Sequence, residues 1–192
     1  MKYIKLVDES SICLYQSAGT VDTYAVKGNK FISNLLNRMK SIMLESKGVG
    51  LAAPQVGKDI RIFIVDGTPI EGENCENFKK VFINATILEE SGEEWGFNEG
   101  CLSIPNVRED VFRKQKIKIE YQDEDFNTHI EEYEGLIARV IQHEYDHIEG
   151  LLFTDKLSSF KKQLLKKKLL KISSGKLSFD YEMQYFKSSK KR

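Results

Sequence analysis

The chain has few cysteines and no long apolar run, which are the features of disulfide frameworks and membrane spans. Its 192 residues include only 3 cysteines and 1 tryptophan, and its 29 basic and 29 acidic side chains cancel. An odd number of cysteines at irregular spacings does not fit a disulfide framework. The zero net charge excludes a polyelectrolyte role for the whole molecule. No apolar run reaches the length of a membrane span, and an acidic residue precedes any signal-peptide core. These absences predict a cytoplasmic protein with no membrane partner.

The apolar content is sufficient for one core. Hydrophobic residues make up 41% of the chain and aromatic residues 10%. A chain of this length folds as one domain, or as one domain with a tail. We predict one domain over residues 1–186, followed by a basic, disordered tail over residues 187–192.

Sequence periodicity predicts more strands than helices. Apolar residues recur at three and four over residues 31–46 and from residue 135 onward, and Ser158 or Ser159 can cap a third helix ending near Ile172. Strands are predicted over residues 60–65, 81–88, 117–121, 128–134 and 176–186, with a polar surface loop around Cys75. We therefore expect an α+β fold. Mostly antiparallel sheets would pack around a central helix, with an N-terminal covering helix and a C-terminal helix and strand.

The strongest chemical signature lies on that central helix. His143 and His147 are four residues apart and are two of the three histidines in the chain. On a helix this spacing places both imidazoles on one face, about 6 Å apart along the axis, where they can share one metal ion. Glu144 lies beside them and can act as a base without taking a coordination site. Leu136 and Val140 fall on the same face as His143, which favours a buried helix over a solvated one.

A third metal ligand is available at Cys101. On its own this residue would be interpreted as a small buried hydrophobe, but beside a two-histidine helix we interpret it as a ligand. Two protease classes do not fit the pattern. The metzincin motif requires a third histidine where this chain has Phe153, and no acidic residue that could act as a gluzincin ligand lies between Ser158 and Asp180.

The glycine-rich segment 48–57 superficially matches a dinucleotide-binding fingerprint. That fingerprint must follow a strand and open a helix, whereas this segment follows a predicted helix and contains Pro54. We therefore interpret it as a turn that presents its backbone and the Gln55 side chain to a pocket.

Three segments together resemble the motifs of the peptide deformylase family. They are Gly-Val-Gly-Leu-Ala-Ala-Pro-Gln at 48–55, Glu-Gly-Cys-Leu-Ser at 99–103 and His-Glu-Tyr-Asp-His at 143–147. The similarity spans approximately residues 30–160, and the order and spacing of the motifs match. Residues 8–14 depart from the Pro-Asp-x-x-Leu-Arg-like opening of the family.

The resemblance implies an enzyme that removes the formyl group from the N-terminal methionine of newly made polypeptides. It implies one divalent ion held by Cys101, His143 and His147, with Glu144 as the general base. It gives stabilisation of the tetrahedral oxygen to the Gln55 amide and the backbone N–H of Leu102. The usual ion of the family is Fe(II), although a thiolate ligand also admits zinc, nickel or cobalt.

A substrate pocket and partners can also be predicted. Leu136 and Val140 either line the methionine pocket or belong to the plain core, and both interpretations remain open. Gly48 and Gly50 would let a peptide backbone pair along the turn. Arg108 or Arg113 would support Glu99 or Asp146 beside the metal ligands.

Beyond formyl-methionyl nascent peptides, the lysine-rich helix after Ser158 or the basic tail is a candidate contact with the ribosome, and a solvated face is the alternative. We expect no sequence-specific nucleic-acid binding.

Two other functions compete with the deformylase. A catalytically silent relative would keep the metal as a structural clip and bind N-termini, although Glu144 and Gln55 are both present. A peptidase would cleave N-blocked peptides in mid-chain.

Overall fold

A computed structural model describes residues 4–5, 17–22, 30–71 and 75–184. The predicted tail and the atypical opening segment lie outside these residues. None of the helices in the described part is long and apolar enough to cross a membrane.

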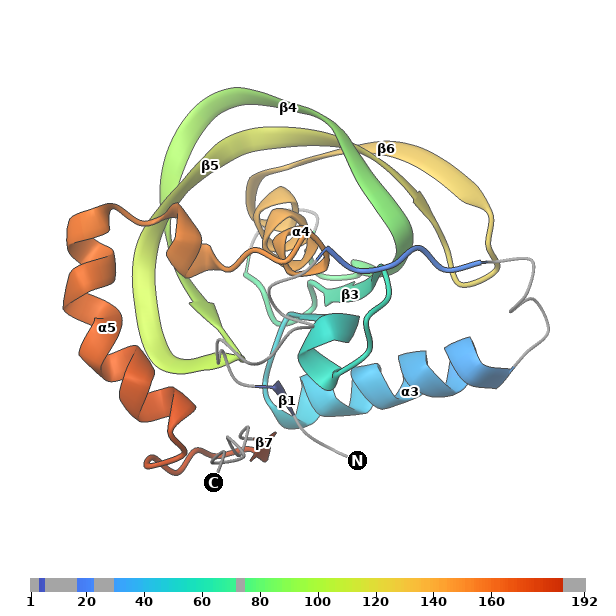
Figure 1. The fold of residues 1–192 in the computed structure, drawn as a ribbon. Helices are drawn as coiled ribbons and strands as arrows, with labels where there is room; N and C mark the ends of the chain where they lie inside the picture. Colours follow the sequence, from blue (N-terminus) through green and yellow to red (C-terminus); the bar gives the residue numbers. More distant parts are fainter. Residues whose placement is uncertain (1–3, 6–16, 23–29, 72–74, 185–192) are drawn as a thin grey trace.

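The main sheet has five antiparallel strands in the order β2-β3-β4-β5-β6. Their bounds are Gly50–Ala52, Ile62–Asp66, Lys79–Cys101, Ile104–Gln122 and Thr128–Glu134. The sequence predicted only short parts of β4 and β5, because the alternation of polar and apolar residues is interrupted. Four register shifts occur between these two strands, and such irregularities bend a strand. The hairpin consequently curves around the central helix (Figure 1).

The central helix α4, Gly135–Ile148, is held between the curved hairpin and β3 (Figure 1). Strand β3 is buried on both faces. Its Phe63 and Val65 pack in one apolar cluster with Ile137 and Ile141 of α4. Its Ile62 and Ile64 pack in another cluster with α3, which spans Lys30–Glu45. The alternation along this strand therefore places one helix on each side of the sheet.

The C-terminal helix α5, Ser159–Ser173, packs beside the β4–β5 hairpin. The predicted cap is confirmed, because Ser158 Oγ accepts a hydrogen bond from the Lys161 N–H at 3.3 Å. Ile172 joins an apolar cluster with Cys101 and Phe153. Helix α5 therefore packs against the end of β4, where Cys101 lies.

The predicted α+β architecture is confirmed, including the central helix and the covering helix α3. Three local predictions were wrong. The glycine-rich turn is the short strand β2 followed by the 3-10 helix η1, Ala53–Val56, because Gly50 to Ala52 pair with β3. Cys75 is buried, with 2% exposure, because it packs in the apolar cluster that contains Ile137.

The last strand is also shorter than predicted. Within the described residues it comprises only β7, Met183–Gln184, which pairs in parallel with β1, Ile4–Lys5. Residues 176–182 are not in a strand. They instead lead the chain from α5 back towards the β4–β5 turn, where Tyr181 makes a hydrogen bond to Leu102.

Candidate metal centre

Three donor side chains converge on one buried point. Sγ of Cys101 and one ring nitrogen each of His143 and His147 all lie within 4.8 Å of one another. Cys101 is the last residue of β4, whereas the two histidines are one turn apart on α4. Sγ of Cys101 lies 3.3 Å from Nε2 of His147, and the ring centroids of the two histidines are 5.1 Å apart. The structure thus brings together the three residues predicted as ligands.

The sulfur of Cys101 accepts two hydrogen bonds from neighbouring segments. The Ser103 N–H donates to Sγ at 3.4 Å, and Nε2 of Gln55 donates to it at 3.7 Å. These contacts fix the position of the sulfur beside the two histidines. Cys101 as a whole is buried, with 8% exposure.

The two histidines have opposite charge preferences. Burial opposes ionisation of His143, but Cys101 and Glu99 outweigh it and raise the pKa of His143 to about 10. Burial and the neighbouring His143 charge hold the pKa of His147 well below its ordinary value. The pocket therefore favours one positive charge near Cys101. A sulfur, two imidazoles and a demand for positive charge fit a divalent transition-metal ion.

Glu99 organises the surroundings of His143. Its Oε2 accepts a hydrogen bond from Nδ1 of His143 at 3.0 Å, which leaves the other ring nitrogen for an ion. Arg113 donates to the same carboxylate from Nε at 2.7 Å and from Nη2 at 2.9 Å. Burial alone would raise the pKa of Glu99, but His143 and Arg113 hold it well below its ordinary value. Glu99 is therefore an anion at neutral pH.

The question of which arginine supports the site is answered by the contacts. Arg113 binds both carboxylates, because its Nη1 also donates to Asp146 at 2.6 Å. Arg108 instead donates to the side chain and backbone oxygens of Asn98.

The sequence interpretation missed Arg139, which donates to Glu99 at 2.9 Å and lies over the Trp95 ring at 4.6 Å. Its position one turn before His143 was the available signal.

Glu144 is a buried carboxylate at the centre. It is 4% exposed, and its Oε2 has no hydrogen-bond partner among the described residues. Burial raises the pKa of Glu144 to about 7. Strand β2 approaches it closely, since a Cβ built on Gly50 would lie 2.5 Å from its Oε1. A glycine at this position leaves room for the carboxylate.

Gln55 and Leu102 lie on two segments that meet beside Cys101. The Gln55 side chain accepts from the Ala52 N–H at 2.8 Å and donates to Ser103 Oγ at 3.1 Å, so both of its ends are fixed. Leu102 is in the two-residue turn between β4 and β5. A Cβ on Gly48 would lie 2.7 Å from Cδ1 of Leu102, so the glycine admits this side chain.

A cavity of about 430 Å³ opens beside these residues. All the residues predicted for the substrate pocket line it, namely Gly48, Gly50, Glu99, Arg108, Leu136 and Val140. Residues of the metal centre and its surroundings line it too, namely Gln55, Cys101, Leu102, His143 and Glu144. Sequence reasoning missed five apolar lining residues, which are Val49, Ile70, Phe97, Ile104 and Val107. Phe97 alternates with Glu99 and Cys101 along β4, and this period of two was a usable signal.

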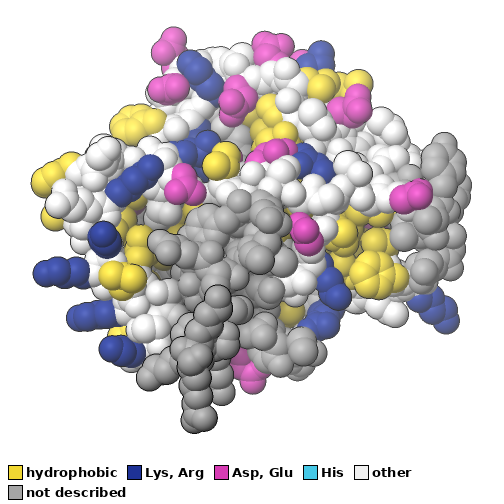
Figure 2. All heavy atoms as spheres, viewed as in Figure 1, with side chains coloured by type: hydrophobic (Ala, Val, Ile, Leu, Met, Phe, Trp, Pro, Cys, Tyr) yellow, Lys and Arg dark blue, Asp and Glu magenta, His cyan; other side chains and the backbone are white. Residues whose placement is uncertain are grey.

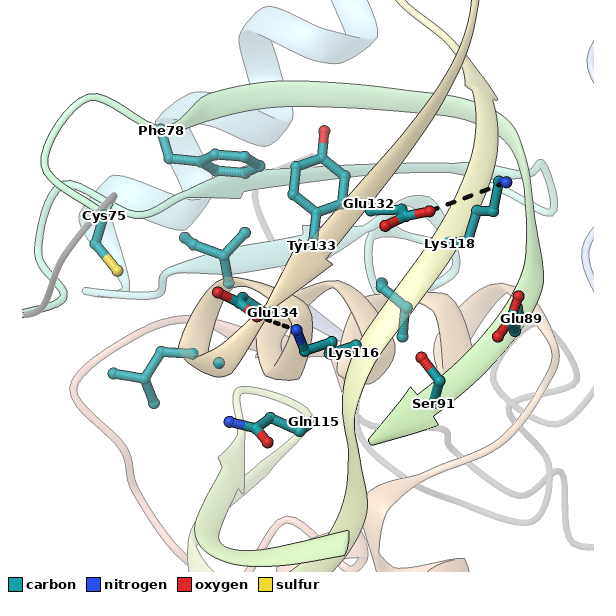
Figure 3. Close-up of a pocket in the computed structure, with 14 residues that line it drawn as sticks. Cys75, Phe78, Glu89, Ser91, Gln115, Lys116, Lys118, Glu132, Tyr133 and Glu134 are labelled. Atoms are coloured by element: carbon teal, nitrogen blue, oxygen red, sulfur yellow. Dashed lines mark ion pairs between the residues drawn. The ribbon is translucent and has the colours of Figure 1, made fainter. Parts of the chain in front are cut away.

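A second cavity, of about 770 Å³, lies between the start of α4 and strands β4 to β6 (Figure 3). Four of its charged side chains form ion pairs, with Lys116 and Glu134 at 2.8 Å and Lys118 and Glu132 at 3.9 Å. Burial raises the pKa of its Cys75 thiol, which disfavours the thiolate. This cavity has no histidine in its lining and is a poor metal site.

Comparisons with known proteins agree with this geometry. A family model described as polypeptide deformylase matches residues 2–163. A peptide deformylase of Christiangramia forsetii is 54% identical over 170 residues, covering 84% of this chain and 87% of the relative. A peptide deformylase of Flavobacterium psychrophilum is 57% identical over 162 residues, covering 80% and 84%.

Solved structures show the same likeness. The crystal structure of a peptide deformylase from Legionella pneumophila aligns with a TM-score of 0.77 and 32% identity, covering 92% of this chain and 97% of the other. The peptide deformylase from Thermotoga maritima aligns with a TM-score of 0.72 and 35% identity, covering 82% and 98%.

Proposed function

Because the chain belongs to the peptide deformylase family, whose members hydrolyse the formyl amide at the N-terminal formylmethionine of new polypeptides, we propose specific roles for its buried residues. Cys101, His143 and His147 hold one divalent ion, and Glu144 handles the proton of the attacking water. The observation that carries this proposal is the convergence of the three donors within 4.8 Å beside an unpartnered carboxylate oxygen.

The thiolate ligand offsets part of the positive charge of the ion. Held by one thiolate and two neutral imidazoles, a divalent ion keeps a net charge near +1 and supplies Lewis acidity that lowers the pKa of a nearby water. Cys101 provides the negative charge, and the Glu99 carboxylate fixes the ring of His143 through Nδ1. We propose Fe(II) as the native ion and expect zinc, nickel or cobalt to be accepted by the same soft ligand set.

Glu144 is the general base in this proposal and later the general acid. The unpartnered Oε2 of Glu144 can take a proton from a water molecule while the oxygen of that water adds to the formyl carbon. It then returns the proton to the departing amine as the carbon–nitrogen bond breaks. The products are formate and a polypeptide with a free amino group. Gly50 passes close to the carboxylate, and Glu144 is only 4% exposed.

Gln55 and Leu102 stabilise the charge that develops on the formyl oxygen. The proposed donors are the Gln55 amide and the backbone N–H of Leu102, and both residues line the cavity together with Cys101. Preorganised donors of this type are each worth about 3 kcal/mol of activation free energy. The hydrogen bonds from Gln55 to Ser103 and from Ala52 to Gln55 hold the amide ready before substrate arrives.

The apolar end of the 430 Å³ cavity receives the methionine side chain. Leu136 and Val140 of α4 form one wall, and Phe97 of β4 contributes another. The peptide backbone pairs along Gly48 and Gly50 beside the edge strand β2. Such pairing depends little on side chains, so varied sequences after the methionine are tolerated.

We also propose that the protein works in the cytoplasm and that α5 contacts ribosomal RNA. Lysine side chains gather over this helix (Figure 2). Phe160 and Leu164 are 70% and 66% exposed on it, and basic side chains of this density bind phosphate backbones. Reversing the charge of Lys167 and Lys171 should abolish co-sedimentation with ribosomes. Deleting residues from Lys187 onward tests the tail separately, and unchanged co-sedimentation of both variants would remove the reason for this assignment.

Formate release from formyl-Met-Ala-Ser by anaerobically purified protein tests the proposed chemistry. We expect steady release that a chelator abolishes and that added Fe(II) restores. Release that is indifferent to the chelator would contradict the metal centre, and cleavage of N-blocked peptides in mid-chain would instead indicate a peptidase. A silent binding protein would release no formate, but the presence of Glu144 and Gln55 in one buried site gives that alternative no support.

A further inference from the structure

The chain beyond the part matched by the family model returns to the metal centre. The family match ends at residue 163, and residues 177–183 follow α5 and lie against the turn between β4 and β5. The hydroxyl of Tyr181 donates a hydrogen bond to the backbone carbonyl of Leu102 at 2.8 Å, across 79 positions of sequence. We call residues 177–183 the C-terminal strap.

The strap is anchored on both sides of Tyr181. Phe179 packs against the cluster that contains Cys101, Ile104 and Ile172. Met183 packs against that cluster and also against the one formed by α3 and β3, which Tyr181 contacts too. After it, β7 pairs with β1. Apolar contacts on both flanks restrict where the tyrosine ring can lie, so its hydroxyl is presented to the turn at a small entropic cost.

Three groups of the turn at Leu102 are each fixed by a contact: the Leu102 side chain, the Ser103 side chain and the Leu102 carbonyl. The Leu102 side chain fits against Gly48, and the next residue, Ser103, is bonded to Gln55. The carbonyl of Leu102 is fixed by Tyr181. Residue 102 sits immediately after the ligand Cys101, and its N–H is the proposed donor to the formyl oxygen. A rotation of the backbone here would move that donor away from the oxygen.

We propose that Tyr181 is a positioning residue, which fixes the β4–β5 turn so that the Leu102 N–H points at the developing oxyanion. This inference rests on the proposed function. It predicts that the C-terminal strap acts on the chemical step rather than on peptide binding or on the metal, because the hydroxyl touches neither. A neutral hydrogen bond of this kind corresponds to about a threefold to tenfold change in rate if it is expressed in the transition state.

Tyr181→Phe tests the inference, with Tyr133→Phe as the matched control. The control also removes one tyrosine hydroxyl, which is bonded to Glu131 on β6 away from the metal centre. We expect Tyr181→Phe to lower kcat for formyl-Met-Ala-Ser by about threefold to tenfold, with KM and metal content unchanged. The control should retain the kcat of the unaltered protein. An unchanged kcat in Tyr181→Phe would overturn the inference, as would an equal fall in both variants.

A second readout does not depend on activity. Amide hydrogen exchange at Leu102 and Ser103, measured on metal-free protein, should be faster in Tyr181→Phe than in the unaltered chain and unchanged in the control. Tyr181→Met, which also lacks a donor, should give the same exchange rate as the Phe variant. If the unaltered protein released no formate, the proposed function would fail, yet faster exchange would still establish that Tyr181 holds the turn. Equal exchange in all four proteins would overturn the positioning role.

Discussion

Oε2 of Glu99 accepts a hydrogen bond from Nδ1 of His143 at 3.0 Å, deep inside the protein. This contact fixes the tautomer of the imidazole and makes its other nitrogen a better metal ligand. Replacing Glu99 with Gln removes the negative charge while keeping the shape. We expect metal affinity to fall about 10-fold to 100-fold, as measured by competition with a chromogenic chelator.

Glu132→Gln provides the control for the loss of a carboxylate. Glu132 is a surface residue with a side chain 77% exposed and a distant partner, Lys118. Its substitution should leave metal affinity unchanged. Equal affinity in Glu99→Gln and in the unaltered protein would show that the Glu99 carboxylate does not tune the ligand.

Gly50→Ala probes the close approach of β2 to the base. The added Cβ would lie 2.5 Å from Oε1 of Glu144, so the carboxylate must move. A displacement of about 1 Å in a catalytic group can cost about 100-fold in rate. We therefore expect kcat/KM to fall by roughly that factor. Gly19→Ala is the control, since its Cβ would meet nothing closer than 3.5 Å. Similar kcat/KM values for the two variants would argue against a tightly positioned Glu144.

Glu131 makes the free energy of unfolding depend on pH. Burial alone would raise the pKa of Glu131, but hydrogen bonds from Lys80, Tyr133 and Tyr121 lower it from 4.5 to about 2. A lowered pKa contributes stability that is fully present above pH 4.5 and is lost as the pH falls towards 2. The side chain is 34% exposed, so we expect a contribution of only about 1 kcal/mol after screening.

The corresponding measurement compares the free energy of unfolding of the unaltered protein and Glu131→Gln as a function of pH. The difference between them should be constant near neutrality and should shrink as the pH is lowered below 4.5. A difference that grows in acid would have the wrong sign for this mechanism.

The proposed iron makes the enzyme sensitive to air. Fe(II) and a metal-bound thiolate both oxidise, so formate release should decline during aerobic storage. Protein reconstituted with zinc or nickel in place of iron should keep its initial rate for longer. Iron-loaded protein that retains full activity after prolonged exposure, without catalase or reductant, would contradict Fe(II) as the native ion.

Local spacing explains how much of the site could be predicted. Residues 136, 140, 143 and 147 share one face of α4, so helix geometry alone places Leu136, Val140 and His143 along the 430 Å³ cavity, with His147 one turn further on the same face. The long strands could not be predicted, because the register shifts in β4 and β5 break the alternation on which strand prediction depends.

Contacts across long sequence separations were predicted only as alternatives, as for Arg108 and Arg113, or not at all. Arg113 joins Glu99 and Asp146 from 14 and 33 positions away. The contact between Tyr181 and Leu102 spans 79 positions, and no periodic pattern encodes such pairings.

The central claim is tested most directly by the formate release rate of Glu144→Gln, with metal content determined on the same sample. Glutamine keeps the size of the side chain but cannot take a proton from water. We predict a normal metal content and a rate lower by several orders of magnitude, because proton transfer and the positioning of water are both lost. A Glu144→Gln protein that carries its metal and releases formate at the unaltered rate would contradict the account.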